Sequence, residues 1–170
     1  MTSIRLMIAG MLGMALSASA WGADVVKEVE IKLEPVNFVQ LERAIAAHKG
    51  KVVLVDVWGE FCLPCKKKFP HVVQMHKDWA KDGLVVISLS VDDPDNKIRA
   101  LDFLKKNAAT FQNFLLDDTE ENKDKWEKKL AHTAPPILHV FDRSGKLVKS
   151  FEFEKAEEID KFVQEVLKAK

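Results

Sequence analysis

Two nearly uninterrupted apolar runs, at residues 52–57 and 84–91, constrain the fold of this chain more than any other feature. Runs of this kind are typical of strands that are buried on both faces, as in parallel sheets covered by helices. The segment between them, from near Cys62 to Ala80, carries large apolar side chains along one side at helical spacing. These segments therefore predict a strand, a long helix closed by Gly83, and a second strand.

Weaker patterns predict further elements on both sides of this unit. A short edge-like strand is expected at residues 29–33, and a helix capped by Asn37 should end at Gly50. After the second buried strand, the chain predicts a helix with Ile98, Leu101 and Leu104, a strand at 114–116, and a solvated helix within 117–129 with Trp126 and Leu130 facing the core. A strand at 137–141 follows, and a turn at 142–145 leads into an extended segment at 146–153. The last helix has one apolar face, made of Ile159, Phe162, Val163, Val166 and Leu167. This order predicts an α/β fold in layers with a mixed sheet.

Length, charge and cysteine content exclude several classes of protein. A chain of 170 residues corresponds to one domain of ordinary size, or to one domain with a tail. Its 26 basic and 26 acidic residues cancel, which argues against binding to nucleic acid. Two cysteines are too few for a disulfide-rich scaffold or for a four-cysteine zinc site.

The first 20 residues have the pattern of a secretory signal peptide. Arg5 supplies the positive start, an uncharged apolar run follows, and an Ala-Ser-Ala triplet ends at Ala20. We expect cleavage after Ala20 and export to the periplasm, because the apolar run is short for the alternative, a retained membrane anchor. The remainder would form an N-terminal extension at 21–35 and one domain at 36–170. Two cysteines in an oxidising compartment tend to pair.

The motif Cys62-Leu63-Pro64-Cys65 lies where the first buried strand gives way to the long helix. Unpaired N–H groups and the dipole at a helix N-terminus favour a thiolate, here that of Cys62. Cys65 follows about one turn later, close enough to bond to Cys62 and less exposed. Such a pair can exchange disulfides in two steps, in which Cys62 attacks the substrate and Cys65 resolves the mixed disulfide. Pro64 suits the first helical turn, where its missing N–H would be unpaired anyway.

The segment from Trp58 to Cys65, followed by Phe69-Pro70, resembles the thioredoxin superfamily and, within it, the exported TlpA/ResA-like thiol-disulfide oxidoreductases. The resemblance extends from about Val36 to the C-terminus. It implies a thioredoxin-like fold, with a central sheet flanked by helices and the extra strand and helix of this group at 90–117. It also implies that Pro70 kinks the long helix and that Trp58 lies against the active site as part of the substrate-binding region.

The resemblance further implies a docking loop for substrates. Thr133-Ala134-Pro135-Pro136 matches the cis-proline loop of the family, which lies across from the cysteines. The spacing to Asp142 and Gly145 favours Pro136 as the cis residue, with Pro135 as the alternative. Pro136 would shape the docking groove and keep metals off the thiols. The preceding residue usually offers backbone N–H and C=O groups to the substrate, but Pro135 has no N–H, which suggests a narrower set of partners.

Asp56 matches the buried acid of the thioredoxins proper, which is thought to accept the proton of the resolving cysteine. The TlpA/ResA-like group more often has Asn there and a Glu three residues after the second cysteine, where this chain has Lys68. We therefore assign proton transfer to Asp56 alone. A carboxyl in a strand buried on both faces should have a raised pKa, closer to that of a thiol. The alternative is a water-exposed Asp at the strand end.

The run Lys66-Lys67-Lys68 follows the motif directly. Positive charge near Cys62 would favour its thiolate. A solvated helix face nevertheless explains most of the run, and the helix dipole disfavours cations at this end.

The sequence thus predicts a protein-disulfide oxidoreductase that acts as a periplasmic reductant. Its redox-active group would be the Cys62–Cys65 disulfide, without a metal or another cofactor. The expected partners are protein substrates with disulfides or thiols and a membrane thiol-electron transporter as electron donor, and the chain would act as a monomer.

Two other functions remain open at this stage. A copper-binding chaperone or assembly factor of thioredoxin fold would use both cysteines with His132 or His139, which flank the proline pair. A disulfide oxidase or isomerase would use the same residues as the reductant and differ only in its reduction potential.

Overall fold

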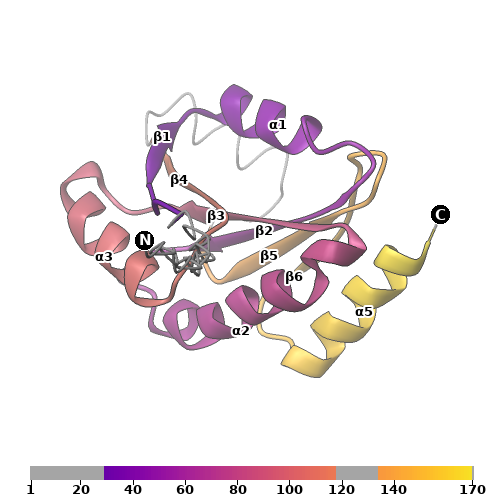
Figure 1. Cartoon of the computed structure of the whole chain (residues 1–170). Helices are drawn as coiled ribbons and strands as arrows, with labels where there is room; N and C mark the ends of the chain where they lie inside the picture. The colour runs from indigo at the N-terminus through magenta and orange to yellow at the C-terminus, as the bar shows by residue number, and fades with distance from the viewer. Residues whose placement is uncertain (1–28, 118–133, 170) are drawn as a thin grey trace, which may run out of the picture.

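A six-stranded mixed sheet forms the centre of the computed structural model, which describes residues 29–117 and 134–169 (Figure 1). The strands lie in the order β1-β4-β3-β2-β5-β6. The first four of this order are parallel, whereas β5 and β6 run antiparallel to their neighbours. The bounds are β1 Glu34–Val36, β2 Val52–Trp58, β3 Leu84–Ser90, β4 Gln112–Leu116, β5 Ile137–Phe141 and β6 Leu147–Phe151. This arrangement confirms the predicted α/β fold with a mixed sheet.

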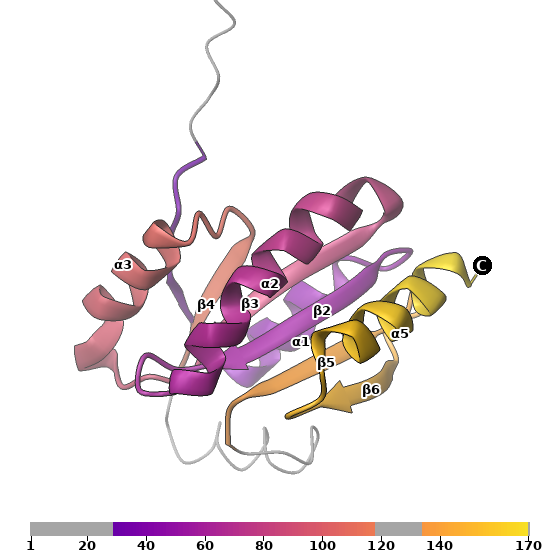
Figure 2. The same ribbon diagram turned by 90° about the horizontal axis from the view of Figure 1, so that it is seen from below.

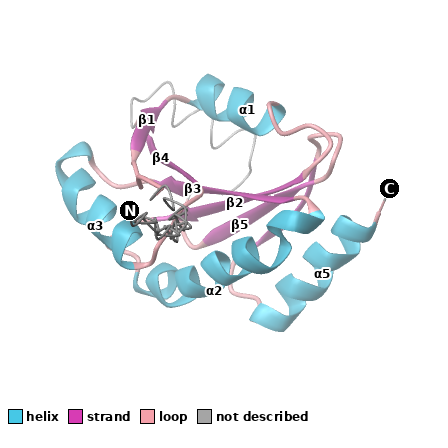
Figure 3. Cartoon of the chain, viewed as in Figure 1, coloured by secondary structure: helices cyan, strands magenta, loops and turns pink. Residues whose placement is uncertain are grey.

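Helices cover both faces of the sheet (Figures 2 and 3). The helix α1 lies on one face, α2 and α5 lie on the other, and α3 packs beside the β1–β4 edge. The bounds are α1 Phe38–Ala46, α2 Leu63–Trp79, α3 Lys97–Lys106 and α5 Ala156–Lys168, with short 3₁₀ turns at Ala80–Asp82 and Pro94–Asn96. Gly83, with a φ of 99°, ends the unit that begins with α2, as predicted.

Strand β2 is buried along its whole length, as its apolar sequence predicted. Val53, Val55 and Val57 belong to the core beneath α1. Val52 and Leu54 belong to the core beneath α2 and α5. Because side chains alternate along a strand, Asp56 lies on the face covered by α2.

Local sequence explains how the first helix begins. The Asn37 side chain accepts a hydrogen bond from the N–H of Gln40 at 2.9 Å, and the Gln40 side chain accepts one from the N–H of Asn37 at 2.8 Å. This reciprocal capping box satisfies two N–H groups that the helix leaves free. The predicted cap at Asn37 is confirmed, although α1 ends at Ala46 and a turn leads on to Gly50.

Several sequence predictions need correction. The edge strand lies at Glu34–Val36 rather than at 29–33, where Leu33 is instead buried in the core. Ile98 is one of the three apolar residues from which the helix α3 was predicted, but it is 74% exposed, whereas Ala100 and Leu104 are buried. The last strand is shorter than the extended segment predicted at 146–153.

The signal peptide and the helix predicted within 117–129 fall largely outside the described residues. Over 29–117 and 134–169, no helix combines the length and the apolar character needed to cross a membrane.

Candidate active site

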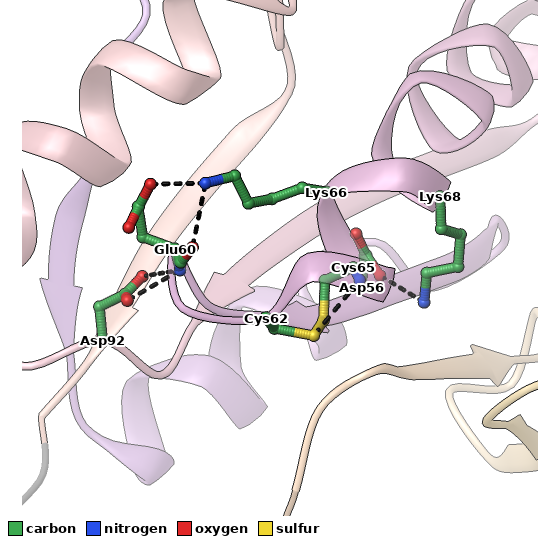
Figure 4. The surroundings of a disulfide bond; sticks show 7 residues. All are labelled: Asp56, Glu60, Cys62, Cys65, Lys66, Lys68 and Asp92. Atoms are coloured by element: carbon green, nitrogen blue, oxygen red, sulfur yellow. Dashed lines mark hydrogen bonds and ion pairs between the residues drawn. A yellow bond between two sulfur atoms is a disulfide. The ribbon is translucent and has the colours of Figure 1, made fainter.

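Cys62 and Cys65 form a disulfide across the first turn of α2, with their Cα atoms 5.3 Å apart (Figure 4). Cys62 is the N-cap residue, and its Sγ accepts a hydrogen bond from the N–H of Cys65 at 3.3 Å. Cys62 keeps 6% of its surface exposed, whereas Cys65 is completely buried. The structure thus confirms both the predicted proximity of the cysteines and their unequal exposure.

Two prolines shape the helix that carries the cysteines. Pro64 is the second residue of α2, where a missing N–H costs no helical hydrogen bond. Pro70 lies inside α2 and offers no N–H to the carbonyl of Lys66 one turn earlier.

The loop between β2 and α2 is held from two sides. The N–H of Glu60 donates to both carboxylate oxygens of Asp92, at 2.8 and 2.9 Å. The ammonium of Lys66 donates to the carbonyl of Glu60 at 3.1 Å and to its carboxylate at 2.6 Å. The Lys66 hydrogen bond lowers the pKa of the Glu60 carboxyl below its usual range.

Asp92 and Glu60 were not singled out in the sequence. The position of Asp92, just after a buried parallel strand, could have indicated a functional role, because side chains at the ends of such strands commonly line functional sites in α/β proteins.

Asp56 is completely buried on the side of the sheet that carries the disulfide. Burial raises the pKa of its carboxyl, and the positive charge of Lys68 opposes this shift. The predicted burial and the predicted direction of the pKa shift are confirmed, and the alternative of a water-exposed Asp56 is wrong.

A solvated helix face was expected for most of the lysine run, but Lys68 does not belong to such a face. Its side chain is only 16% exposed, and its Nζ lies 3.0 Å from Oδ1 of Asp56. Apart from this ion pair, neither the Asp56 oxygens nor Nζ of Lys68 have a hydrogen-bond partner among the described residues. Lys68 follows Cys65 by three residues and therefore lies on the same helix face, a spacing that could have revealed its inward position. Of the three lysines in this run, Lys67 is exposed, whereas Lys66 and Lys68 are partly buried.

Trp58 lies beneath the disulfide in the same apolar cluster as both cysteines. Its Nε1 donates to Oγ of Ser88 at 3.2 Å, and its ring packs against Phe69 and Phe103 with centroids 5.3 and 5.0 Å away. The side chain has no exposed surface. Trp58 can therefore support the site from below, but it cannot touch a substrate in this conformation.

The peptide bond between Pro135 and Pro136 is cis, which makes Pro136 the cis residue, as the spacing had favoured. Pro136 is buried and Pro135 is half-buried. Pro136 directly precedes Ile137, which pairs with Val57 near the end of β2. The proline pair therefore lies at the end of the sheet from which the chain continues to Cys62.

Two exposed apolar side chains flank Cys62. Phe61 is 68% exposed and Leu63 is 62% exposed. The Phe61 ring lies so close to Gly59 that a Cβ atom there would be 2.5 Å from Cε1 of the ring. Gly59 is thus needed for this ring position. The sequence reasoning missed both apolar residues, since exposure at a helix start has no periodic signature.

His139 does not lie beside the cysteines. It pairs with Val55 in the sheet, and its side chain therefore points to the α1 face, away from Asp56 and the disulfide. Its Nδ1 is 2.7 Å from Oγ of Ser150. The alternative of a copper site formed by both cysteines and His139 is therefore wrong. His132 falls outside the described residues. No cluster of three or more His, Cys, Asp or Glu side chains suited to a metal occurs in the described part of the chain.

Comparisons with known proteins point in one direction. A family model described as the AhpC/TSA family matches residues 24–157. The thiol-disulfide oxidoreductase ResA of Bacillus subtilis is 29% identical over 118 residues, which span 69% of this chain and 60% of that protein. ResA of Bacillus cereus strain ATCC 10987 is 23% identical over 169 residues, spanning 96% of this chain and 92% of that protein.

Solved structures share the fold at low sequence identity. A thiol:disulfide interchange protein of the thioredoxin family from Chlorobium tepidum aligns with a TM-score of 0.59 and 22% identity, covering 72% of this chain and 83% of that one. The thioredoxin domain of a Bacteroides vulgatus thiol-disulfide oxidoreductase aligns with a TM-score of 0.57 and 21% identity, covering 69% and 83%. These similarities confirm the thioredoxin-like fold.

Proposed function

The chain belongs to the AhpC/TSA family and carries the cysteine pair of a thiol-disulfide oxidoreductase, and we propose that it reduces disulfides of exported proteins. One observation carries this proposal: the disulfide spans the first turn of α2, with Cys62 at the N-cap and Cys65 completely buried. Cys62, which keeps 6% of its surface exposed at the helix N-terminus, suits attack, and the completely buried Cys65 one turn later suits resolution.

The reaction moves two electrons from the reduced chain to the substrate. The Cys62 thiolate attacks a substrate disulfide, forms a mixed disulfide and releases one substrate sulfur as a thiolate. Cys65, once deprotonated, attacks Sγ of Cys62 and releases the second substrate sulfur. The chain is left with the Cys62–Cys65 disulfide, and the substrate carries two thiols.

Asp56 would accept the Cys65 proton in the second step. Efficient proton transfer needs a base whose pKa approaches that of the donor. Burial moves the pKa of Asp56 in this direction. Lys68 limits the rise, which keeps the carboxylate available as a base.

The substrate would dock at the end of the sheet near Pro136. The half-buried Pro135 has no N–H to offer, so the main-chain contacts would be fewer than in relatives with another residue there. Phe61 and Leu63 add exposed apolar area beside Cys62, whose sulfur attacks the substrate.

We further propose that the mature protein is a periplasmic monomer, cleaved after Ala20. A reductant in an oxidising compartment needs a supply of electrons, for which a membrane thiol transporter is the expected source. The disulfide itself would be the redox group.

The reduction potential of the cysteine pair tests the proposal. The protein is equilibrated in dithiothreitol or glutathione buffers, and alkylated thiols are counted by mass. A value near the roughly −270 mV of thioredoxin supports a reductant, whereas a value near the roughly −120 mV of DsbA would reverse the direction of electron flow. Absence of a reversible couple would refute thiol-disulfide exchange. As a control, Cys65→Ser should accumulate the mixed disulfide on Cys62, and Cys62→Ser should form none.

A further inference from the structure

We propose that Asp92, outside the cysteine motif, is a positioning residue for Cys62 and acts through the backbone of Glu60. This inference rests on the proposed thiol-disulfide exchange and adds a residue to its machinery. Asp92 follows β3, and its carboxylate points at the loop that leads into α2 (Figure 4).

The Asp92 carboxylate is a buried hydrogen-bond acceptor that the surrounding residues hold in place. It is 2% exposed; the single N–H of Glu60 donates to both of its oxygens, and Oγ of Ser90 donates to one of them at 2.7 Å. The N–H of Asp92 in turn donates to the same Ser90 hydroxyl at 3.2 Å. Hydrogen bonds to an ionised acceptor are about twice as strong as neutral ones, which explains how a buried carboxylate is tolerated here.

The Glu60 peptide groups connect three parts of the fold. Its N–H is held by Asp92 after β3, and its carbonyl is held by Lys66 from the second turn of α2. A neighbouring hydrogen bond, from the N–H of Val91 to the carbonyl of Trp58 at 2.9 Å, fixes the β3 segment against the end of β2. The loop is therefore fastened on both sides of one residue.

This residue sits inside the turn that places Cys62. The N–H of Cys62 donates to the carbonyl of Gly59 at 3.0 Å, which closes a turn with Glu60 as its second residue. Cys62 then has extended backbone angles, φ −88° and ψ 95°, which let its Sγ accept the Cys65 N–H. A turn that is free to move would let Sγ leave the helix N-terminus, where the thiolate is favoured.

Asp92→Ala tests the role, because it leaves the part-buried Glu60 N–H without its carboxylate acceptor. In the reduced protein, we expect alkylation of Cys62 by iodoacetamide at pH 7 to slow about tenfold, with its pH midpoint shifted upward. The value of kcat/KM for insulin reduction should fall by a similar factor. Asp92→Asn keeps one oxygen for the Glu60 N–H and should stay within about threefold of the wild type.

The matched control is Asp142→Ala. Asp142 also holds a loop, because its carboxylate accepts from the N–H groups of Ser144 and Lys146 and from the Ser144 hydroxyl, but it lies at the other end of β5. Asp142→Ala should lower the melting temperature and leave Cys62 alkylation and insulin reduction unchanged.

The outcomes separate the inference from the proposed function. Equal alkylation rates in Asp92→Ala and Asp142→Ala would overturn the positioning role, and so would an Asp92→Asn protein as slow as Asp92→Ala. A wild type that reduces no disulfide would refute the proposed function, while the alkylation comparison would still report on positioning. If Asp92→Ala does not fold, Lys66→Met frees the other side of Glu60. An unchanged alkylation rate in that variant would show that holding Glu60 does not position Cys62 and would overturn the inference.

Discussion

Two lysine–carboxylate pairs flank the disulfide, and they differ in one respect, their access to water. Lys66 and Lys68 are two residues apart on α2, and each reaches a carboxylate that precedes the cysteines, at 2.6 Å in Glu60 and 3.0 Å in Asp56 (Figure 4). The Glu60 side chain is 30% exposed, whereas the Asp56 side chain is completely buried.

Because of this difference in exposure, the pKa values of the two carboxyl groups shift in opposite directions. The pKa of Glu60 is lowered, because the hydrogen bond from Lys66 and its positive charge outweigh the loss of solvation at this partly exposed side chain. The pKa of Asp56 is raised, because the loss of solvation outweighs the attraction of Lys68. Exposed pairs contribute little to stability, and buried pairs can fail to recover the cost of desolvation. The buried pair of Lys68 and Asp56 is therefore poorly suited to stabilise the fold and better suited to the proposed proton transfer.

The largest expected effect concerns catalysis by the buried carboxylate. Asp56→Asn removes the base for Cys65, and we expect insulin reduction at pH 7 to slow about 100-fold, within the range for general base catalysis. Glu60→Gln is the control at the exposed pair and should change the rate less than about twofold. A rate in Asp56→Asn within threefold of the wild type would refute proton transfer by Asp56.

Removal of the buried lysine should come next in size. Lys68→Met leaves the Asp56 charge buried without a counter-ion, and we expect the free energy of unfolding of the oxidised protein at pH 8 to fall by about 2 kcal/mol. Lys66→Met should cost about 0.5 kcal/mol or less, because that pair is half-exposed. Urea unfolding measures both.

A double variant sharpens this result. Asp56→Asn with Lys68→Met leaves no buried charge at this position and should recover most of the stability lost in Lys68→Met. Equal losses in Lys68→Met and Lys66→Met would show that burial does not distinguish the two pairs.

The pH dependence of stability should have opposite signs at the two pairs. The native pKa of Asp56 lies above its unfolded value, near 3.8, so the unfolded chain releases this proton first as pH rises. The stability that Asp56 contributes is therefore fully present below its unfolded pKa. It is lost as pH rises from there through the raised native pKa, by at most about 1.4 kcal/mol per pH unit. Glu60, with a lowered pKa, loses its contribution as pH falls below about 4.5.

Urea unfolding of oxidised wild type and Asp56→Asn at pH 3.5 and pH 8, which lie on either side of the unfolded value, checks this sign. The wild type should lose stability relative to Asp56→Asn at the higher pH. A constant difference between the two proteins would contradict a raised native pKa.

The smallest expected effect is that of salt. The few tenths of a kcal/mol lost in Lys66→Met at low ionic strength should disappear in 1 M NaCl, where the Debye length is about 3 Å. The loss in Lys68→Met should persist, because ions do not reach the buried pair. Equal salt sensitivity in unfolding midpoints would contradict the difference in burial.

Much of the site follows from local sequence. The β-branched run at 52–57 required a buried strand, so Asp56 had to be buried with it. The position of Cys62 before a helical segment gave both its place at the N-cap and the proximity of Cys65. The resemblance to the thioredoxin superfamily placed the cis-proline loop, and the spacing after it favoured Pro136 over Pro135.

Other parts could not be predicted in this way. Ile98 has the spacing of a core residue on α3 but is exposed, because the orientation of a helix depends on what it packs against. His139 was one of two histidines that could approach the cysteines by their position in the chain, yet strand alternation turns its side chain to the opposite face of the sheet.

The sequence by itself determined where the chain changes from strand to helix, which strand is buried on both faces, and which residues carry the thiol chemistry. These properties are set by periodicity and by neighbours within a few residues. Tertiary structure decided that Lys68 meets Asp56 and that Asp92 holds Glu60, which is 32 residues away in the chain. Such contacts depend on strand order, on register and on the rotation of α2 about its axis. No local pattern specifies these, because they arise only when the layers pack together.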